Sequence, residues 1–455
     1  MSSDDDKYTH KPRKVPTGRL SRLASFGGLA GSIAANVVKD AGKQLLSGSK
    51  PSLSRSVLSS DNARSITNKL ANMRGAAMKV GQLLSMDAGD ILPEQWEPIL
   101  SRLRQQADPM PKSQLLSALK SAWGDDWFAK FSYFSFEPIA AASIGQVHKA
   151  TLSDGTQLAI KVQYPGVKQS INSDIDNVVS LIKLSGALPK QIDLTPLLTK
   201  AKQQLHEEAD YLLEAQHMRV YAEKIAHLTH FEVPCVYQPL TTDTVLCMTY
   251  VEGQALESMT KQGDIDFVVN ALFELTLDEI FNFRMTQSDP NFANFLYDAS
   301  RHASNPKAIK AIKLLDFGAT RKISATLSAS YLAMANAMQS QDRRNIKAAL
   351  FDLNLIDTRM SDSTIDVILE ACWLAAECLQ TQTYNFKQSN LIQRIQSITM
   401  PLIQNKDATA TPDFDVALIN RKVTGIVLLA NRLGANVKLQ SILNKAICTV
   451  QPKEE

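Results

Sequence analysis

This chain of 455 residues lacks a large excess of charge of either sign. Lys and Arg together number 49 and Asp and Glu number 46, so the formal net charge is only +3. Nucleic-acid-binding proteins usually concentrate basic residues on one face, and so even a balance argues against that class. We therefore expect no nucleic-acid partner. Hydrophobic residues make up 44% of the chain, enough to bury a large core, which excludes disorder as the state of most of it.

The sequence also lacks closely spaced cysteine pairs. The cysteines are odd in number and no two are spaced as CxxC: Cys235, Cys247, Cys372, Cys378 and Cys448. This usage fits a reducing compartment, with the cysteines as small buried apolar residues. The seven histidines do not cluster with the cysteines, so no zinc site is predicted.

Long hydrophobic runs are missing as well. The longest weakly apolar run, 23–38, has 16 residues diluted with Ser, Gly and Asn, whereas a membrane-spanning helix needs about 20 predominantly apolar residues. We expect no transmembrane helix. Asp4, Asp5 and Asp6 open the chain and argue against a signal or transit peptide. The basic stretch that follows, 7–22, either contacts an anionic membrane or is a solvated tail.

The pattern of the chain predicts four parts: a disordered tail at 1–18, a helical extension at 19–135, a small lobe at 136–252 and a larger lobe at 253–455. The extension carries apolar residues at helical spacing, above all over 63–86.

Further elements are predicted on both sides of the start of the small lobe. Helices are expected at 94–107 and 111–131. The lobe then begins with β-branched, apolar segments at 136–149 and 156–163, separated by a Ser-Asp-Gly turn. Two such segments around a short turn predict a β-hairpin.

The rest of the small lobe is expected to hold one long amphipathic helix at 194–229 and a strand pair at 233–238 and 244–251. The remaining chain is mostly helical, apart from a polar segment at 287–294 and a short strand at 312–316. This order predicts an α+β protein with a small antiparallel sheet followed by a larger helical lobe.

A lysine and a glutamate are candidates for holding the phosphates of a nucleotide. Lys161 ends the apolar strand segment Ala-Ile-Lys, where a fixed cation would point into a cleft and meet α- and β-phosphates. Glu208 lies in the long predicted helix and could pair with Lys161 and orient it. Taken singly, a strand lysine is more often surface decoration, and an acid on a polar helix face is usually only solvated.

Two further motifs follow in the order in which a protein kinase carries them. Asp289 and Asn294 reproduce the DxxxxN spacing of the kinase catalytic loop, in which the Asp lies by the attacking hydroxyl and the Asn binds a metal. Asp316 opens the tripeptide Asp-Phe-Gly after an apolar strand, and this Asp binds Mg²⁺ in kinases. Carboxylate and amide oxygens suit a hard dication. Alone, Asp289 before a proline would indicate only a turn.

The adenine and phosphate loops complete the comparison with kinases. Residues 248–253 follow an apolar strand, where a kinase hinge meets adenine through its backbone, here at Thr249 and Val251. In place of the Gly-rich phosphate loop there is an alanine-rich one, expected to contact the nucleotide: Ala140, Ala141, Ala142 and Ser143. Alanine adopts positive φ less freely than glycine, so this loop is stiffer. Gln287 and Ser288 replace the His and Arg that precede the kinase catalytic Asp.

The four kinase-like motifs, together with these departures from the kinase pattern, resemble those of one known family. From about residue 16 to residue 450 the chain closely resembles the UbiB (ADCK-type) atypical kinase-like family, in its ubiquinone-biosynthesis branch. The matching residues are Lys79 and Gln82 for the KxGQ signature, Ala140 to Ser143 for the alanine-rich loop, Glu208 and Asp210 for the ExD motif, and Asp289, Asn294 and Asp316 for the catalytic and metal positions.

The resemblance implies a kinase-like bilobal fold with an antiparallel-sheet N-lobe, a mainly helical C-lobe and a preceding helical extension. It implies that Lys161, paired with Glu208, holds ATP phosphates and that Asp289 lies by the γ-phosphate. Asn294 and Asp316 would bind Mg²⁺.

Three residues are implied to gate the cleft: Lys79, Gln82 and Asp210. Without the resemblance, Lys79 would be read as an exposed helix lysine.

The resemblance also implies function and partners. The expected activity is Mg²⁺-dependent hydrolysis of ATP, with ATP or ADP as the bound nucleotide, in support of ubiquinone biosynthesis. Implied partners are ubiquinone-biosynthesis proteins, anionic membrane lipid and an isoprenoid or phenolic small molecule, and a homodimer stays open. We expect a bacterial cytoplasmic protein that meets the inner membrane peripherally.

Two other functions stay open. A true protein or small-molecule kinase would transfer phosphate to a defined acceptor much faster than to water. A nucleotide-sensing, lipid-binding scaffold would bind nucleotide without turnover, an idea motivated by the small-residue run 23–38 and the basic stretch before it.

Overall fold

The structure is a computed structural model that describes residues 109–142, 144–184, 195–289, 291–300, 311–405 and 412–449. The chain divides into two compact units. Unit 1 holds the described residues up to Gln216 and the segment Cys235–Tyr250, and unit 2 holds His217–Pro234 and the described residues from Val251 onward. The predicted tail, the helices over 63–107 and the residues Lys79, Gln82 and Ser143 lie outside the described residues. The predicted lobe boundary stays a prediction.

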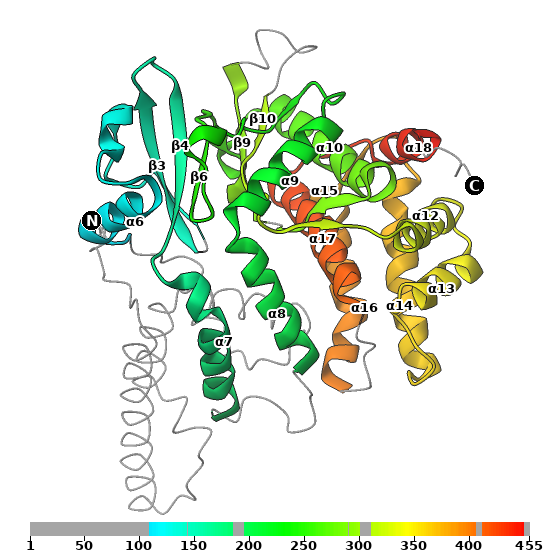
Figure 1. The fold of residues 1–455 in the computed structure, drawn as a ribbon. Helices are drawn as coiled ribbons and strands as arrows, with labels where there is room; N and C mark the ends of the chain where they lie inside the picture. The colour runs from blue at the N-terminus through cyan, green and yellow to red at the C-terminus, as the bar shows by residue number, and fades with distance from the viewer. Residues whose placement is uncertain are drawn as a thin grey trace, which may run out of the picture. The chain divides into compact units, whose positions relative to one another are not determined.

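Unit 1 is built on one antiparallel sheet with strand order β1-β3-β4-β6, in which β2 also pairs with β3 (Figure 1). The strands are β1 (Phe131–Phe134), β2 (Ala140–Ala141), β3 (Gly145–Leu152), β4 (Gln157–Gln163) and β6 (Val245–Thr249). The β3–β4 hairpin confirms the prediction, and Gly155 in its turn has a φ of 89°, which glycine adopts without a steric penalty.

The first strand of the hairpin is shorter than predicted. It begins at Gly145 and not at residue 136, because the preceding residues fold back onto it. The N–H of Ser135 donates to the carbonyl of Lys149 at 2.8 Å, and that of Ile139 donates to the carbonyl of Val147 at 2.8 Å. The alanine-rich segment is therefore the outer arm of a small β2–β3 hairpin.

The helices of unit 1 differ from the prediction in two places. They are α6 (Lys112–Trp123), the 3₁₀ helix η3 (Trp127–Lys130), α7 (Val167–Leu184), α8 (Thr195–Glu208), the start of α9 (Tyr211–Lys224) and the 3₁₀ helix η4 (Gln238–Leu240). The helix predicted to reach residue 131 stops at Gly124, whose φ is 87°. The single long helix predicted at 194–229 is wrong, because it is broken between α8 and α9.

Asp210 is the cause of that break. Its Oδ1 accepts the backbone N–H groups of Leu212 at 3.2 Å and Leu213 at 3.1 Å, which satisfies two donors at the start of α9. A side chain that caps a new helix competes with continuation of the old one. Helix α9 continues from unit 1 into unit 2.

The strand predicted at 233–238 does not form as such. These residues contact β6 through a single bridge between Val236 and Met248 and through the N–H of Tyr237, which donates to the carbonyl of Cys247. The adjoining 3₁₀ turn η4 then leads the chain into β6.

Unit 2 contains short ladders of strands. One sheet has the order β5-β10-β9-β7, β8 pairs with β11, and β12 pairs with β13. Their bounds are β5 (Phe231–Glu232), β7 (Gln254–Ala255), β8 (Met285–Gln287), β9 (Phe295–Tyr297), β10 (Ile312–Leu314), β11 (Thr320–Lys322), β12 (Tyr384–Asn385) and β13 (Asn436–Val437). Strand β10 confirms the short strand predicted at 312–316.

The rest of unit 2 is helical, as predicted, and Figure 1 shows its later helices in yellow to red. The α-helices are α10 (Gln262–Asp278), α12 (Ala325–Gln339), α13 (Arg343–Asp352), α14 (Asp362–Ala375), α15 (Phe386–Ser389), α16 (Leu391–Asn405), α17 (Phe414–Leu433) and α18 (Leu439–Thr449). The shorter turns are η5 (Leu256–Ser258), the π-helical η6 (Glu279–Phe283), η7 (Phe292–Asn294) and η8 (Ala376–Leu379). The α+β class is therefore confirmed.

Side-chain caps explain where several of these helices begin. Ser324, Asp342 and Ser361 each accept a backbone N–H from the first turn of α12, α13 and α14, respectively. Such caps stabilise a helix by about 1 kcal/mol each. Within the residues that the structure describes, no helix is long and apolar enough to cross a bilayer.

The cysteines agree only in part with the prediction that they are buried. All five are unpaired thiols, and Cys247 and Cys378 are buried, whereas Cys235 and Cys448 are exposed. Burial raises the pKa of the Cys378 thiol to about 12, so this side chain behaves as a small apolar residue.

Candidate active site

Lys161 is a buried cation in the middle of the unit 1 sheet. It lies in β4 opposite Val147 of β3 and Leu246 of β6, and its side chain is 8% exposed. Its Nζ donates to both carboxylate oxygens of Glu214, at 2.8 and 2.9 Å. Burying an ammonium group is costly unless it is paired and hydrogen-bonded, and this bidentate contact meets that requirement.

The carboxylate that contacts Lys161 is thus Glu214, and the predicted pairing with Glu208 stays a prediction. Glu208 ends α8, and its Oε1 accepts from Gln204 Nε2 at 3.3 Å. Glu214 lies in the first turn of α9, where the helix dipole favours a carboxylate. Because Asp210 restarts the helix, the first turn of α9 is the part that meets β4.

The alanine-rich loop is tied closely to β3. Ala140 lies opposite Val147, Ala141 lies opposite Gln146, and the N–H of Ala142 donates to the carbonyl of Gly145 at 2.9 Å. The side chains of Ala140 and Ala141 are exposed. The loop is thus a short hydrogen-bonded hairpin, in line with the stiffness expected of alanine.

Gly145 allows a close approach at the base of this hairpin. A Cβ there would lie 2.5 Å from the carbonyl oxygen of Val162 and 2.7 Å from the hydroxyl of Tyr211. Both distances are far below van der Waals contact. A side chain at this position would push β3 away from β4 and from α9, which carries the partner of Lys161.

The candidate hinge residues lie where β6 ends. The N–H of Thr249 donates to the carbonyl of Cys235 at 2.9 Å, and its Oγ1 accepts the N–H of Cys235 at 2.9 Å. That N–H of Thr249 is engaged within the fold, so it is not the group that would meet adenine. Val251 opens the second segment of unit 2 and is half-buried.

Unit 2 brings three of the predicted residues together. Asn294 Nδ2 donates to Asp289 Oδ2 at 3.1 Å, and Asp289 Oδ1 accepts the N–H of Asn291 at 3.1 Å. The carbonyl of Asn294 accepts the N–H of Leu315 at 2.9 Å, which brings the residue before Asp316 to the same loop. Asp289, Asn294 and Asp316 are all half-buried.

The Asp-Phe-Gly segment is held from several sides. Asp316 Oδ1 accepts the N–H of Gly318 at 2.9 Å. Phe317 is fully buried and its ring packs edge-on against Tyr221 of α9, with ring centroids 5.1 Å apart. His217 Nδ1 lies 3.3 Å from the carbonyl oxygen of Phe317. The segment therefore packs against α9.

The donor set in unit 2 fits Mg²⁺ bound with a nucleotide. Proteins hold Mg²⁺ mainly through one or two carboxylates, and phosphate oxygens and water complete its octahedral shell. Two carboxylates and one amide oxygen are available from Asp289, Asp316 and Asn294. In the described part of the chain no group of three or more His, Cys, Asp or Glu gathers as a metal cage would need. A cation here would need the phosphate oxygens of a ligand.

Sequence reasoning missed two residues of this region. Glu214 was hidden by the prediction of one continuous helix, although its position four residues after Asp210 is a signal for the first turn of a capped helix. In the sequence, Gln287 stands out only as a departure from the kinase pattern. Its Nε2 donates to the carbonyl oxygen of Asp316.

Comparison with known proteins identifies related sequences over most of the chain. The ABC1 atypical kinase-like domain family matches residues 102–350. The chain is 34% identical over 439 residues to the mitochondrial atypical kinase COQ8 of Saccharomyces cerevisiae, which covers 95% of this chain and 86% of that protein. It is also 34% identical over 437 residues to the mitochondrial atypical kinase COQ8B of Rattus norvegicus, covering 95% and 81%.

A solved structure shows the same fold. The complex of Rv3197 with erythromycin from Mycobacterium tuberculosis aligns with a TM-score of 0.59 at 24% identity, covering 86% of this chain and 97% of that one. The kinase-like fold and the expectation of an enzyme of ATP-dependent phosphoryl transfer are confirmed. The sequence motifs, the fold and these relatives lead to one conclusion: the chain belongs to the ABC1 (UbiB, ADCK-type) family of atypical kinase-like proteins.

Proposed function

We propose that this protein binds ATP with Mg²⁺ and hydrolyses it in support of ubiquinone biosynthesis at a membrane surface. The observation that carries the proposal is the hydrogen-bonded connection of Asp289, Asn294 and the Leu315–Asp316 segment in unit 2. Kinase-like enzymes use this set of residues for phosphoryl transfer. The resemblance to COQ8-type relatives supports the link to ubiquinone.

Each residue has a distinct part in this proposal. Lys161 holds the α- and β-phosphates, and Glu214 orients its ammonium group through two hydrogen bonds. Asp289 lies by the γ-phosphate and orients the attacking water. Asp316 and Asn294 would hold Mg²⁺, which when bound neutralises charge on the phosphate oxygens.

A gate completes the proposal. It consists of Lys79 and Gln82, which lie outside the described residues, and of Asp210, which caps α9. These residues are proposed to favour water, or a small acceptor, over a protein substrate. The short β2–β3 hairpin supports an atypical phosphate loop, since it is closed by the bond from Ala142 to Gly145. We further propose peripheral contact with anionic lipid and stimulation by an isoprenoid or phenolic molecule.

The experiment that tests the site is thermal stability with nucleotide, with and without Mg²⁺. A ligand that binds only the native state stabilises it, by about 2.7 kcal/mol at a concentration 100 times its Kd. We expect a Mg²⁺-dependent rise in Tm that is lost in Asp316→Asn. The matched control is Asp357→Asn, because Asp357 Oδ1 also accepts the N–H two residues onward, from Arg359 at 2.8 Å. An equal rise in wild type and Asp316→Asn would refute the role of Asp316.

The reaction and pathway need separate measurements. Release of inorganic phosphate that exceeds transfer to any added acceptor supports hydrolysis, and the reverse result supports a kinase. Restoration of ubiquinone in a strain that lacks its own UbiB-family gene tests the pathway, with Asp316→Asn as the negative control. Absence of co-sedimentation with anionic vesicles, with or without nucleotide, would argue against the membrane contact.

A further inference from the structure

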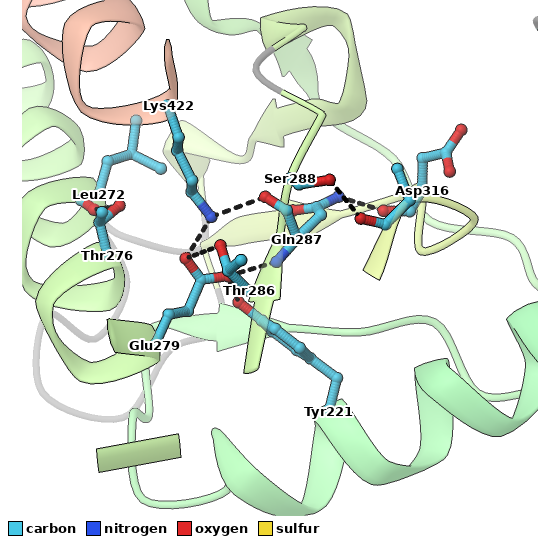
Figure 2. Close-up of polar contacts among 10 residues, drawn as sticks. Tyr221, Leu272, Thr276, Glu279, Thr286, Gln287, Ser288, Asp316 and Lys422 are labelled. Atoms are coloured by element: carbon cyan, nitrogen blue, oxygen red, sulfur yellow. Dashed lines mark hydrogen bonds and ion pairs between the residues drawn. The ribbon is translucent and has the colours of Figure 1, made fainter. Parts of the chain in front are cut away.

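A buried ion pair in unit 2 contacts Gln287, two residues before Asp289, and Figure 2 shows its contacts. Glu279 is fully buried and Lys422 is 5% exposed. Glu279 opens the π-helical turn η6 at the end of α10, and Lys422 comes from α17, so the pair joins elements far apart in the chain. π-helical turns are rare and occur frequently at functional sites.

Glu279 is saturated with donors. Its Oε1 accepts from the hydroxyl of Tyr221 at 2.7 Å and from the N–H of Gln287 at 2.9 Å. Its Oε2 accepts from the hydroxyl of Thr286 at 3.2 Å and from Lys422 Nζ. Burial and the Glu279 carboxylate raise the pKa of Tyr221, which therefore stays a donor. A buried carboxylate with four donors is fixed in position.

Lys422 and Glu279 together bind the backbone of Gln287, and we call these three residues the clamp. Its Nζ donates to Glu279 and also to the carbonyl of Gln287, at 3.0 Å. The ion pair thus binds both backbone groups of Gln287, the N–H through Glu279 and the C=O through Lys422.

The geometry of β8 explains why this clamp is needed. In an antiparallel ladder a residue points its N–H and C=O either both toward the partner strand or both away from it. Gln287 lies opposite Thr320 of β11, and its two groups point away, toward the ion pair. Gln287 is fully buried, so without Glu279 and Lys422 both groups would lose their partners.

The side chain of Gln287 links the clamp to the Asp-Phe-Gly segment. Its Nε2 donates to the carbonyl oxygen of Asp316, as Figure 2 shows. Its backbone leads within two residues to Asp289. The adjacent Ser288 fixes the same junction, because its N–H and its hydroxyl both donate to the carbonyl of Ala319, at 3.1 and 2.6 Å.

We infer that Glu279, Lys422 and Gln287 are positioning residues that hold Asp289 and Asp316 in register for the metal-bound nucleotide. The inference rests on the proposed function. It assigns to a buried ion pair the anchoring of the loop in which Gln287 stands in place of the kinase histidine. None of the three is proposed to touch the nucleotide.

The test separates positioning from stability. Removing one partner of a buried pair leaves an uncompensated charge, whereas replacing both by apolar residues is often tolerated. The variants are therefore the double change Glu279→Leu/Lys422→Met and the single change Gln287→Leu. The single change leaves the Glu279–Lys422 pair intact and so creates no unpaired buried charge. The control is Tyr331→Phe, which removes the hydroxyl bonds from α12 to Asn420 and Val416 of α17.

The readout is the affinity for a non-hydrolysable ATP analogue, measured with and without Mg²⁺ on folded protein. We expect wild type and Tyr331→Phe to show the same gain in affinity on adding Mg²⁺. In Glu279→Leu/Lys422→Met and in Gln287→Leu we expect the Mg²⁺-dependent gain in affinity to fall about 10- to 100-fold. This is the usual effect of losing a residue that orients a metal ligand. The affinity measured without Mg²⁺ should not change. A merely structural role would lower Tm and leave the Mg²⁺-dependent gain intact.

Each outcome decides a different question. If the double variant does not fold, Gln287→Leu alone decides, and a wild-type gain in Gln287→Leu overturns the inference. If wild type itself gains no affinity with Mg²⁺, the proposed function fails, and the inference that rests on it fails as well. A wild-type gain that is lost in the clamp variants supports both.

Discussion

Lys161 carries a buried positive charge, and its surroundings must supply a partner for it. It sits in a central strand with its side chain 8% exposed, and the bidentate contact with Glu214 offsets part of the cost of that burial. The same burial reduces screening by water, which in the proposed function would strengthen the attraction between the ammonium group and phosphate oxygens.

The first prediction concerns this pair. Glu214→Gln removes the carboxylate from a buried ammonium and should destabilise the protein by about 3–5 kcal/mol, with loss of ATP turnover. The double variant Lys161→Met/Glu214→Leu should recover most of the stability and none of the turnover. Urea unfolding and phosphate release measure the two effects. Wild-type stability in Glu214→Gln would show that the pair contributes little.

A second residue-scale prediction concerns pH. His148 Nδ1 lies 2.8 Å from the carbonyl oxygen of Ser135, so Nδ1 carries the proton and Nε2 accepts from Gln146 Nε2 at 2.8 Å. The ring is thus neutral, and burial lowers its pKa below the ordinary value of 6.5. The unfolded chain then binds this proton more readily than the folded one.

The direction of the pH dependence follows from the linkage between proton binding and folding. The stability contributed by neutral His148 is fully present above about pH 6.5 and is lost as the pH falls through the lower folded pKa. Burial lowers the pKa of His230 too, which adds a loss of the same sign. Urea midpoints between pH 5 and 7.5 should fall toward acid, less steeply in His148→Gln than in wild type. Equal slopes in the two proteins would contradict this assignment.

At the scale of elements, the break between α8 and α9 decides which carboxylate reaches Lys161. Asp210 caps α9, and the first turn of that helix carries Glu214. The second half of α9 belongs to unit 2, where Tyr221 contacts both Phe317 and Glu279. One helix therefore contributes to the candidate site residues of both units.

The third prediction tests this cap against an equivalent one. Asp210→Ala and Asp342→Ala each remove a carboxylate that accepts two N–H groups of a first helical turn. Both should cost about 1 kcal/mol of stability. Only Asp210→Ala should also lower ATP turnover, because only α9 carries Glu214.

A conservative change separates two roles of Asp210. Asn is as good a cap as Asp, so Asp210→Asn should keep the stability of wild type. Wild-type turnover in that variant would mean that capping is the whole contribution. Altered turnover at unchanged stability would support the proposed gating role of the charge.

At the scale of the whole molecule, the proposed function draws on residues of both units. Lys161 belongs to unit 1, and Asp289, Asn294 and Asp316 belong to unit 2. A ligand held by groups on both should stabilise both against local opening, since binding adds its free energy to every opening that breaks the site.

The fourth prediction is a pattern of hydrogen exchange. Nucleotide with Mg²⁺ should slow exchange in β4 of unit 1 and in the segments 287–294 and 312–318 of unit 2 over one range of ligand concentration. Helices α13 and α14, which carry none of the proposed ligand groups, serve as the internal control. Protection confined to one unit would contradict the assignment of ligand groups to both.

The sequence by itself determined the features whose chemistry is local. The β3–β4 hairpin follows from alternating apolar residues around a Ser-Asp-Gly turn. Asp289 and Asn294 are close because five residues of turn cannot separate them far, and the structure joins them by a hydrogen bond. The α+β order and the family follow in the same way from short motifs met in a fixed order.

Tertiary structure alone decided which distant groups meet. The sequence offers three glutamates between residues 207 and 214, and only the folded chain shows that Glu214 of α9 contacts Lys161. Nothing in the helical pattern of α17 marks Lys422, which reaches the carbonyl of Gln287 across 135 residues. The physical reason is that the cost of burying a charge depends on which partners the folded chain brings to it, and the spacing of residues along the sequence carries no record of that.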